Sequence, residues 1–244
     1  MPDAGAMFVA DLAKDVARLL VPVACAGCGR DDVPLCEGCS AQWWESPFRA
    51  EEGAGRLEVL GRRQLPVWAV AELEGTAHRA VATWKDGRRR DLDPFFAAAI
   101  GRAAVEVAPH LTGVGPITVV PVPSKRSSVR RRGVDLGRLL ARATATSLAG
   151  AGAAAARDAP LAAAGGRSRG RSSVGRWHSA AVRVVRQPRH GTVLLVDDVM
   201  STGATIARAA EACEGAGIAV IGALVLAATP RRDGGARRGL WWGY

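Results

Sequence analysis

Two adjacent carboxylates precede a short hydroxyl-rich turn in the segment Val193–Thr205, which reads VLLVDDVMSTGAT. Asp197 and Asp198 follow a run of Val and Leu that is typical of a buried strand, so we expect them at the carboxyl end of that strand. Ligands of parallel sheets bind beyond this end of the strands. Paired carboxylates there can accept hydrogen bonds from two neighbouring hydroxyl groups of a sugar.

The turn after the two acids offers groups that bind a phosphate. Small hydroxyls and backbone N–H groups stand at the predicted start of a helix, where the peptide dipoles favour an anion. Gly203 would let the backbone approach a phosphate closely. An ordinary strand-to-helix turn with acidic capping residues is the alternative. A sugar diol and a phosphate occur together in ribose 5-phosphate, and the residues predicted to contact its phosphate are Ser201, Thr202, Gly203, Ala204 and Thr205.

A second anion-binding segment is predicted at residues 124–132, where five of nine residues are Lys or Arg. It follows Ile117–Val122, a β-branched run that predicts another buried strand. Cationic side chains and backbone amides are what a diphosphate requires, and the candidates for this contact are Ser124, Lys125 and Arg126. A solvated basic loop is the alternative. Lys85, at the end of a predicted helix, is a further candidate for the phosphates, although a surface helix end has the same pattern.

Four of the five cysteines form two Cys-x-x-Cys pairs, Cys25 with Cys28 and Cys36 with Cys39. Four thiolates at this spacing can close a tetrahedron around one zinc ion. No position is left open for water, which predicts a structural metal rather than a catalytic one. An iron–sulfur cluster or redox-active thiols are the alternatives. Cys213 stands apart in a predicted helix and fits a small buried residue.

The composition favours anionic partners and excludes a membrane span. The chain carries 33 Lys and Arg against 23 Asp and Glu, a net charge of +10, which suits phosphates, nucleotides or nucleic acid. Arginines that only aid solubility are the alternative. The first 20 residues lack the basic start and apolar block of a signal peptide. The longest apolar run, Ile218–Ala228, is too short to cross a bilayer. We therefore expect a cytoplasmic protein without membrane insertion.

The elements that position these residues alternate along the chain. The predicted strands are 67–73, 117–122, 192–196 and 218–226, and the predicted helices are 8–20, 74–85, 92–108, 135–148 and 204–215. Residues 45–64 have the composition of a connector, and residues 149–176 that of a mobile loop. Strands that alternate with helices predict an α/β fold, a parallel sheet with helices on both faces. We divide the chain into an N-terminal helix and four-cysteine zinc module at 1–45, an α/β domain at 65–230, and a basic, aromatic tail at 231–244.

The acidic pair and the turn after it resemble the ribose-phosphate motif of the type I phosphoribosyltransferases. More narrowly, the chain resembles the ComF family of phosphoribosyltransferase-like proteins over nearly all of residues 25–229. That narrower resemblance is carried by the Cys-rich N-terminus, by Val120–Pro123 followed by Arg130, Arg132–Gly133 and Asp135, and by Trp84–Lys85 with Gly87.

The resemblance implies a type I phosphoribosyltransferase-like fold that binds phosphoribosyl pyrophosphate with Mg²⁺. Asp197 and Asp198 would hold the ribose hydroxyls and stabilise positive charge at the anomeric carbon, and residues 201–205 would bind the 5-phosphate. Lys125, Arg126 and the arginines of a flexible hood, residues 158–178, would neutralise the departing pyrophosphate.

The resemblance to ComF also leaves a different class of function open. The protein would bind the ribose compound without turnover, and would handle single-stranded DNA with partners of DNA uptake. Basic loops and the pairs Trp43–Trp44 and Trp241–Trp242 would suit stacking of bases. Packing of each Trp pair against the protein is the alternative.

Overall fold

The structure is a computed structural model that describes residues 23–55, 57, 64–87, 89–124, 126–163 and 182–230, with only the backbone of Arg126. The predicted helix 8–20, Lys125, most of the predicted hood and the tail 231–244 lie outside these residues.

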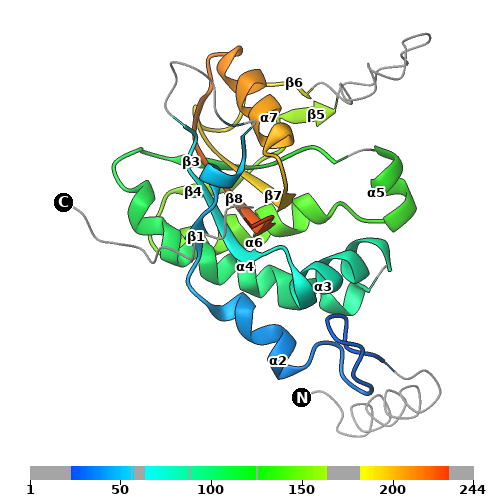
Figure 1. Ribbon diagram of the computed structural model, residues 1–244. Coiled ribbons are helices and arrows are strands. Elements are labelled where there is room, and N and C mark those ends of the chain that lie inside the picture. Colours follow the sequence, from blue (N-terminus) through cyan, green and yellow to red (C-terminus); the bar gives the residue numbers. More distant parts are fainter. Residues whose placement is uncertain are drawn as a thin grey trace, which may run out of the picture.

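A six-stranded sheet in the order β1-β2-β8-β7-β3-β4 forms the centre of the fold (Figure 1). Its strands are β1 (Phe48–Arg49), β2 (Val67–Glu72), β3 (Ile117–Pro121), β4 (Ala155–Arg157), β7 (Thr192–Met200) and β8 (Ala219–Ala228). All neighbouring pairs are parallel except β1 with β2. A separate antiparallel pair joins β5 (Leu161–Ala163) to β6 (Val182–Val184). The predicted parallel sheet is confirmed, with one short antiparallel strand added at its edge.

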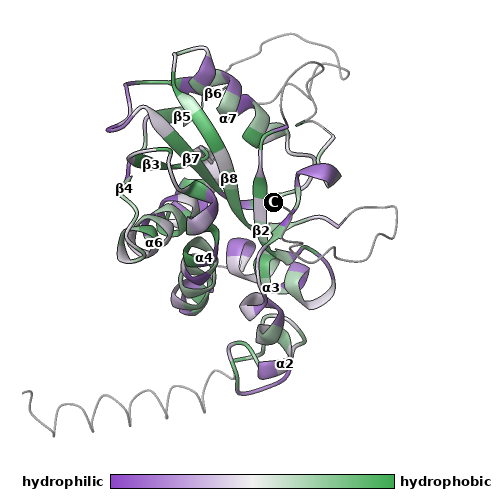
Figure 2. Cartoon of the chain, turned by 90° about the vertical axis from the view of Figure 1, so that its left-hand side faces the viewer, coloured by the Kyte–Doolittle hydropathy of each residue, from purple (hydrophilic) through white to green (hydrophobic). Residues whose placement is uncertain are grey.

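Helices cover both faces of the sheet (Figure 2). On one face lie α3 (Gly75–Asp86), α4 (Asp93–Val107) and α6 (Leu136–Gly150), and on the other lies α7 (Ala204–Glu214). The shorter helices are α2 (Glu37–Ser40), α5 (Arg126–Arg132), η1 (Ala41–Trp44), η2 (Glu51–Gly53), η3 (Arg90–Leu92) and η4 (Ala108–Leu111). Among the described residues, no helix combines the length and apolar character needed to cross a bilayer.

Each face of the sheet has its own apolar core, because successive side chains of a strand point to opposite faces. In β7, Leu194 and Val196 pack on the side of α3, α4 and α6, whereas Val193 and Leu195 pack on the side of α7. The central strands are buried on both faces, which explains why the sequence shows them as continuous apolar runs.

The pair Trp43–Trp44 is divided between the core and the surface. Trp43 is fully buried, with its ring centroid 4.9 Å from that of Phe96. Trp44 is 45% exposed. The idea that both rings stack on bases is therefore wrong for Trp43, because its ring has no exposed surface and packs in the core. The pair Trp241–Trp242 lies outside the described residues.

Three sequence-based predictions of secondary structure need correction. β7 continues to Met200 rather than ending at Val196, because β8 pairs with it as far as Met200 opposite Ala228. Most of the basic segment 124–132, predicted as a loop, is helix α5. The predicted loop 149–176 contains strands β4 and β5. These strands have three residues each, too few to show a period in the sequence.

Candidate functional site

Asp197 and Asp198 lie near the carboxyl end of β7, beyond the last residue of β7 that pairs with β3. The pairing with β3 ends at Pro121 opposite Val196, and the Val122 N–H donates to the Val196 carbonyl oxygen at 2.8 Å. Pro123 has no N–H with which to extend the ladder. Strand β8 accompanies β7 on its other side to Met200. The two acids therefore have a neighbouring strand on one side only.

This point of the sheet is a topological switch point. From β3 the chain passes through α6 on one face to β4, and from β7 it passes through α7 on the opposite face to β8 (Figure 2). The two connections diverge from the β3–β7 pair. Open α/β sheets bind ligands in the crevice outside the carboxyl ends of such strands.

The two carboxyl groups have different partners. The Lys85 ammonium donates to Asp198 Oδ1 at 2.9 Å, and Asp198 is 8% exposed. Asp197 Oδ1 accepts the backbone N–H of Asp198 at 2.8 Å. Burial, and then the charge of Asp198, raise the pKa of Asp197 well above its ordinary value, although the Asp198 N–H and Lys85 oppose this shift. The ionised Asp197 is thus incompletely compensated, and a cation or hydroxyl donors nearby would stabilise it.

The turn between β7 and α7 requires glycine at position 203. Gly203 has φ of +73°, and a Cβ added there would lie 2.8 Å from Leu57 Cγ and 2.9 Å from Ala54 Cβ. Gly203 is also the N-terminal capping residue of α7 and offers no side-chain cap. Ser201 and Thr202 are exposed beside it. The turn therefore presents the exposed hydroxyls of Ser201 and Thr202 beside the amino end of a helix, an arrangement that binds anions.

Ser124 lines a cavity of about 420 Å³ at the same edge of the sheet. The cavity lies between the end of β3, α5, the start of α6 and β5, and its charged lining residues are Arg130, Asp135 and Arg138. Arg126 begins α5, but its side chain and all of Lys125 lie outside the described part of the chain. A cavity of about 790 Å³ lies at the opposite edge, near Pro66 and Val220, away from the acids.

A model of the phosphoribosyl transferase domain matches residues 94–241. The chain belongs to this family. The match spans β3, the acid pair, the turn at Gly203 and α7, so the phosphoribosyl transferase domain contains both candidate anion-binding segments. No curated protein matches the chain.

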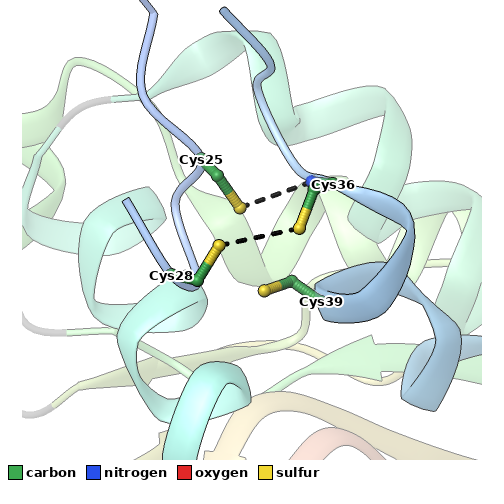
Figure 3. Close-up of side chains that lie close together, drawn as sticks. All are labelled: Cys25, Cys28, Cys36 and Cys39. Atoms are coloured by element: carbon green, nitrogen blue, oxygen red, sulfur yellow. Dashed lines mark hydrogen bonds between the residues drawn. The ribbon is translucent and has the colours of Figure 1, made fainter. Parts of the chain in front are cut away.

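The cysteine cluster lies N-terminal to the matched domain, and its four sulfur atoms converge (Figure 3). All four Sγ atoms lie within 4.8 Å of one another, and those of Cys28 and Cys36 are 3.6 Å apart. Sulfurs placed 2.3 Å from a central zinc ion at tetrahedral angles are about 3.8 Å apart. The four side chains therefore fit a tetrahedral metal, as the spacing predicts.

Local backbone geometry closes the cluster. A Cβ on Gly27 would lie 2.7 Å from Cys39 Sγ, so only glycine fits between the two cysteine pairs. The Cys36 N–H donates to Cys25 Sγ at 3.3 Å. Burial alone would raise the pKa of Cys25. Hydrogen bonds from the backbone N–H groups of Cys28, Cys36 and Gly27 outweigh burial and lower the pKa to about 6. Burial, with hydrogen bonds to the other thiols, raises the pKa of Cys39 to about 12. A bound cation would favour the thiolate at both positions.

The structure gathers most predicted site residues at one edge of the sheet, and it adds contacts that the sequence did not show. Lys85 contacts a carboxylate of the acid pair, whereas the sequence suggested the phosphates or a free helix end. Two further residues of α3 were missed: Arg79 donates to the Gly27 carbonyl oxygen, and Asp86 accepts from Arg131 of α5. No sequence signal identifies these pairs, because their partners lie 45 or more residues away.

Proposed function

We propose that this chain binds phosphoribosyl pyrophosphate at the carboxyl end of β7 and transfers the phosphoribosyl group to an acceptor. The proposal is carried by one observation: in a chain of the phosphoribosyl transferase domain family, two adjacent carboxylates and the start of a helix share the switch point of the sheet. The acids suit a sugar diol, and the helix start suits a phosphate.

Asp197 and Asp198 would accept hydrogen bonds from the two ribose hydroxyls. Because Asp197 is short of positive charge, its carboxylate would also stabilise the cation that develops at the anomeric carbon as pyrophosphate departs. The 5-phosphate would lie on Ser201, Thr202, Gly203, Ala204 and Thr205. The pyrophosphate would lie toward Ser124, Lys125 and Arg126, beside the 420 Å³ cavity. Mg²⁺ would supply charge neutralisation of the diphosphate when bound with it.

For the cysteine cluster we propose zinc, held by Cys25, Cys28, Cys36 and Cys39 in a structural role. Four Cys ligands exclude water from the metal, so it would contribute folding free energy rather than chemistry. With its Cys-rich start, the chain fits the ComF type of this family. We also propose a division of the chain into a zinc module at 1–45, a phosphoribosyltransferase-like domain at 65–230 and a tail at 231–244. A cytoplasmic location remains part of this proposal.

Titration of the wild-type protein with phosphoribosyl pyrophosphate tests the binding step. Isothermal titration in Mg²⁺ should show saturable binding that weakens when Mg²⁺ is omitted, and ribose 5-phosphate should bind less tightly because it lacks the diphosphate. A screen of candidate bases, with release of pyrophosphate as the measured signal, then tests transfer of the phosphoribosyl group. If the protein fails to bind phosphoribosyl pyrophosphate in Mg²⁺, the proposed function is wrong.

Handling of single-stranded DNA in DNA uptake is the second candidate, and the exposed Trp44 together with Arg130, Arg131 and Arg132 of α5 favours it. Binding through these groups would weaken steeply as salt rises, because phosphate contacts release counterions. Fluorescence anisotropy with a labelled oligonucleotide at two salt concentrations distinguishes the candidates. DNA binding combined with phosphoribosyl pyrophosphate binding but no turnover with any base would favour this second function.

A further inference from the structure

We propose that α3 is a brace that couples metal binding at the cysteine cluster to ligand binding at the carboxyl end of β7. In Figure 1, α3 lies between the cysteine loop and α5. One side of α3 contacts the loop, and its last two residues contact Asp198 and α5. This inference rests on the proposed function, which identifies the ligand as phosphoribosyl pyrophosphate.

The cysteine loop is attached to one face of α3. Thr76, Arg79 and Thr83 follow each other at helical spacing and therefore share this face. Arg79 Nε donates to the Gly27 carbonyl oxygen, and Thr83 Oγ1 donates to that of Ala26 at 3.4 Å. Both acceptors stand between Cys25 and Cys28, so α3 holds the loop that supplies the first two sulfur atoms.

The second pair of cysteines is attached to the same face. Gln42, three residues after Cys39, donates from Nε2 to Thr76 Oγ1 at 3.0 Å. A Cβ on Gly27 would contact both Cys39 Sγ, at 2.7 Å, and Thr76 Cβ, at 3.3 Å. The cysteine loop therefore packs closely against α3 at Gly27.

The far end of α3 contacts both candidate ligand-binding segments. The Lys85 ammonium is 2.9 Å from Asp198 Oδ1, and the two side chains are only 23% and 12% exposed. Asp86 accepts a hydrogen bond from Arg131 at 3.0 Å and lies 3.9 Å from Arg132, both in α5, which follows Ser124. Lys85 is thus a positioning residue for Asp198. The Asp86–Arg131 pair is exposed, at 65% and 61%, and adds only a weak contact to the basic segment.

The helix between these ends is continuous and anchored in the core, so it connects the two sites directly. Its 12 residues span about 18 Å. Another face of the helix is buried in the core and consists of Ala77, Ala80, Val81 and Trp84. The cysteine loop, by contrast, has few apolar side chains of its own, and without metal it would lose its fold. Loss of the loop would remove the contacts on the first face and leave Lys85 less firmly placed against Asp198.

Removal of zinc should weaken binding of phosphoribosyl pyrophosphate by about tenfold, within the range typical of coupled sites. Coupling is reciprocal, so phosphoribosyl pyrophosphate should slow the release of zinc to a colorimetric chelator by a similar factor. Lys85→Met should retain the metal but abolish this protection, and Lys85→Arg should restore part of it. Equal zinc release with and without bound ligand in the wild-type protein would overturn the proposal.

A matched pair of variants on α3 separates the brace from general destabilisation. Arg79→Ala removes the bond to the Gly27 carbonyl oxygen and should weaken ligand binding about fivefold in zinc-loaded protein. His78→Ala is the control, because His78 is exposed on the same helix. Equal affinities of these two variants would contradict the brace.

Hydrogen exchange of the protein with and without zinc tests the brace without any need for phosphoribosyl pyrophosphate. Zinc removal should raise exchange in residues 75–86 and near Asp198, but leave α6 protected. If the wild-type protein binds no phosphoribosyl pyrophosphate, the proposed function fails while this measurement still tests the brace. Unchanged exchange in α3 after zinc removal would overturn the brace while leaving the proposed function intact.

Discussion

The cysteine cluster and the acid pair differ in how their parts are brought together. The four cysteines lie within residues 25–39, and backbone N–H groups of the same loop support their sulfur atoms. The acid pair depends on the tertiary fold, since Lys85 and Asp198 are 113 residues apart. The cluster offers a complete ligand set for one ion. The acid pair retains a carboxyl that is poorly compensated, which suits a ligand that arrives, reacts and leaves.

Loss of one cysteine should give the largest effect on stability. Cys36→Ser removes one of four metal ligands, and loss of a structural metal belongs to the mechanisms that cost about 4 kcal/mol or more. We expect less than one zinc per chain by elemental analysis and a marked fall in the melting temperature. Cys213→Ala is the matched control, because Cys213 lies in α7, buried in the core away from the cysteine cluster, and its loss should leave the zinc content unchanged. Full zinc content in the Cys36 variant would show that the cluster is not the metal site.

A smaller effect is expected in the turn of the acid site. Gly203→Ala combines a positive φ with contacts of 2.8 and 2.9 Å to Leu57 and Ala54, a strain of about 1–3 kcal/mol. Gly150→Ala is the control, since it lies at the end of α6 with nothing within 4 Å of an added Cβ, and it should leave stability equal or slightly higher. Denaturant unfolding compares the two variants. Equal stability would mean that the turn is free to rearrange, unlike the closed cysteine loop.

The smallest predicted change is a gain in stability. Because the folded-state pKa of Asp197 is raised, the native protein binds this proton more tightly than the unfolded chain does. Stability therefore falls as pH rises from the ordinary pKa of about 3.9 through the raised value, and the loss persists above it. Asp197→Asn removes that penalty, so the variant should be more stable than the wild type at pH 7. Melting curves should show the difference shrinking toward pH 4. A variant that is less stable at pH 7 would mean that Asp197 serves the fold.

The sequence was sufficient where the determinants are local or strongly periodic. The cysteine spacing, the apolar run before Asp197 and the β-branched run at Ile117 predicted the cysteine cluster and the strands β7 and β3. The sequence did not reveal that α5 is helical, because its arginines give no apolar period. It also did not reveal that Arg131 of α5 contacts Asp86 of α3, because the two residues are 45 positions apart. The Lys85–Asp198 pair was missed because it depends on how α3 packs beside β7, which no local pattern encodes.

Titration of the double variant Asp197→Asn, Asp198→Asn tests the central claim most directly. Each carboxylate should contribute roughly 1.5–3 kcal/mol through charge-assisted hydrogen bonds to a ribose hydroxyl. Loss of both should cost on the order of 3 kcal/mol or more, about a hundredfold in affinity. Isothermal titration with phosphoribosyl pyrophosphate in Mg²⁺ should therefore show little or no binding, while circular dichroism and the zinc content match those of the wild type. Wild-type affinity in the double variant would contradict the account, because the acid pair would then not be the ribose site.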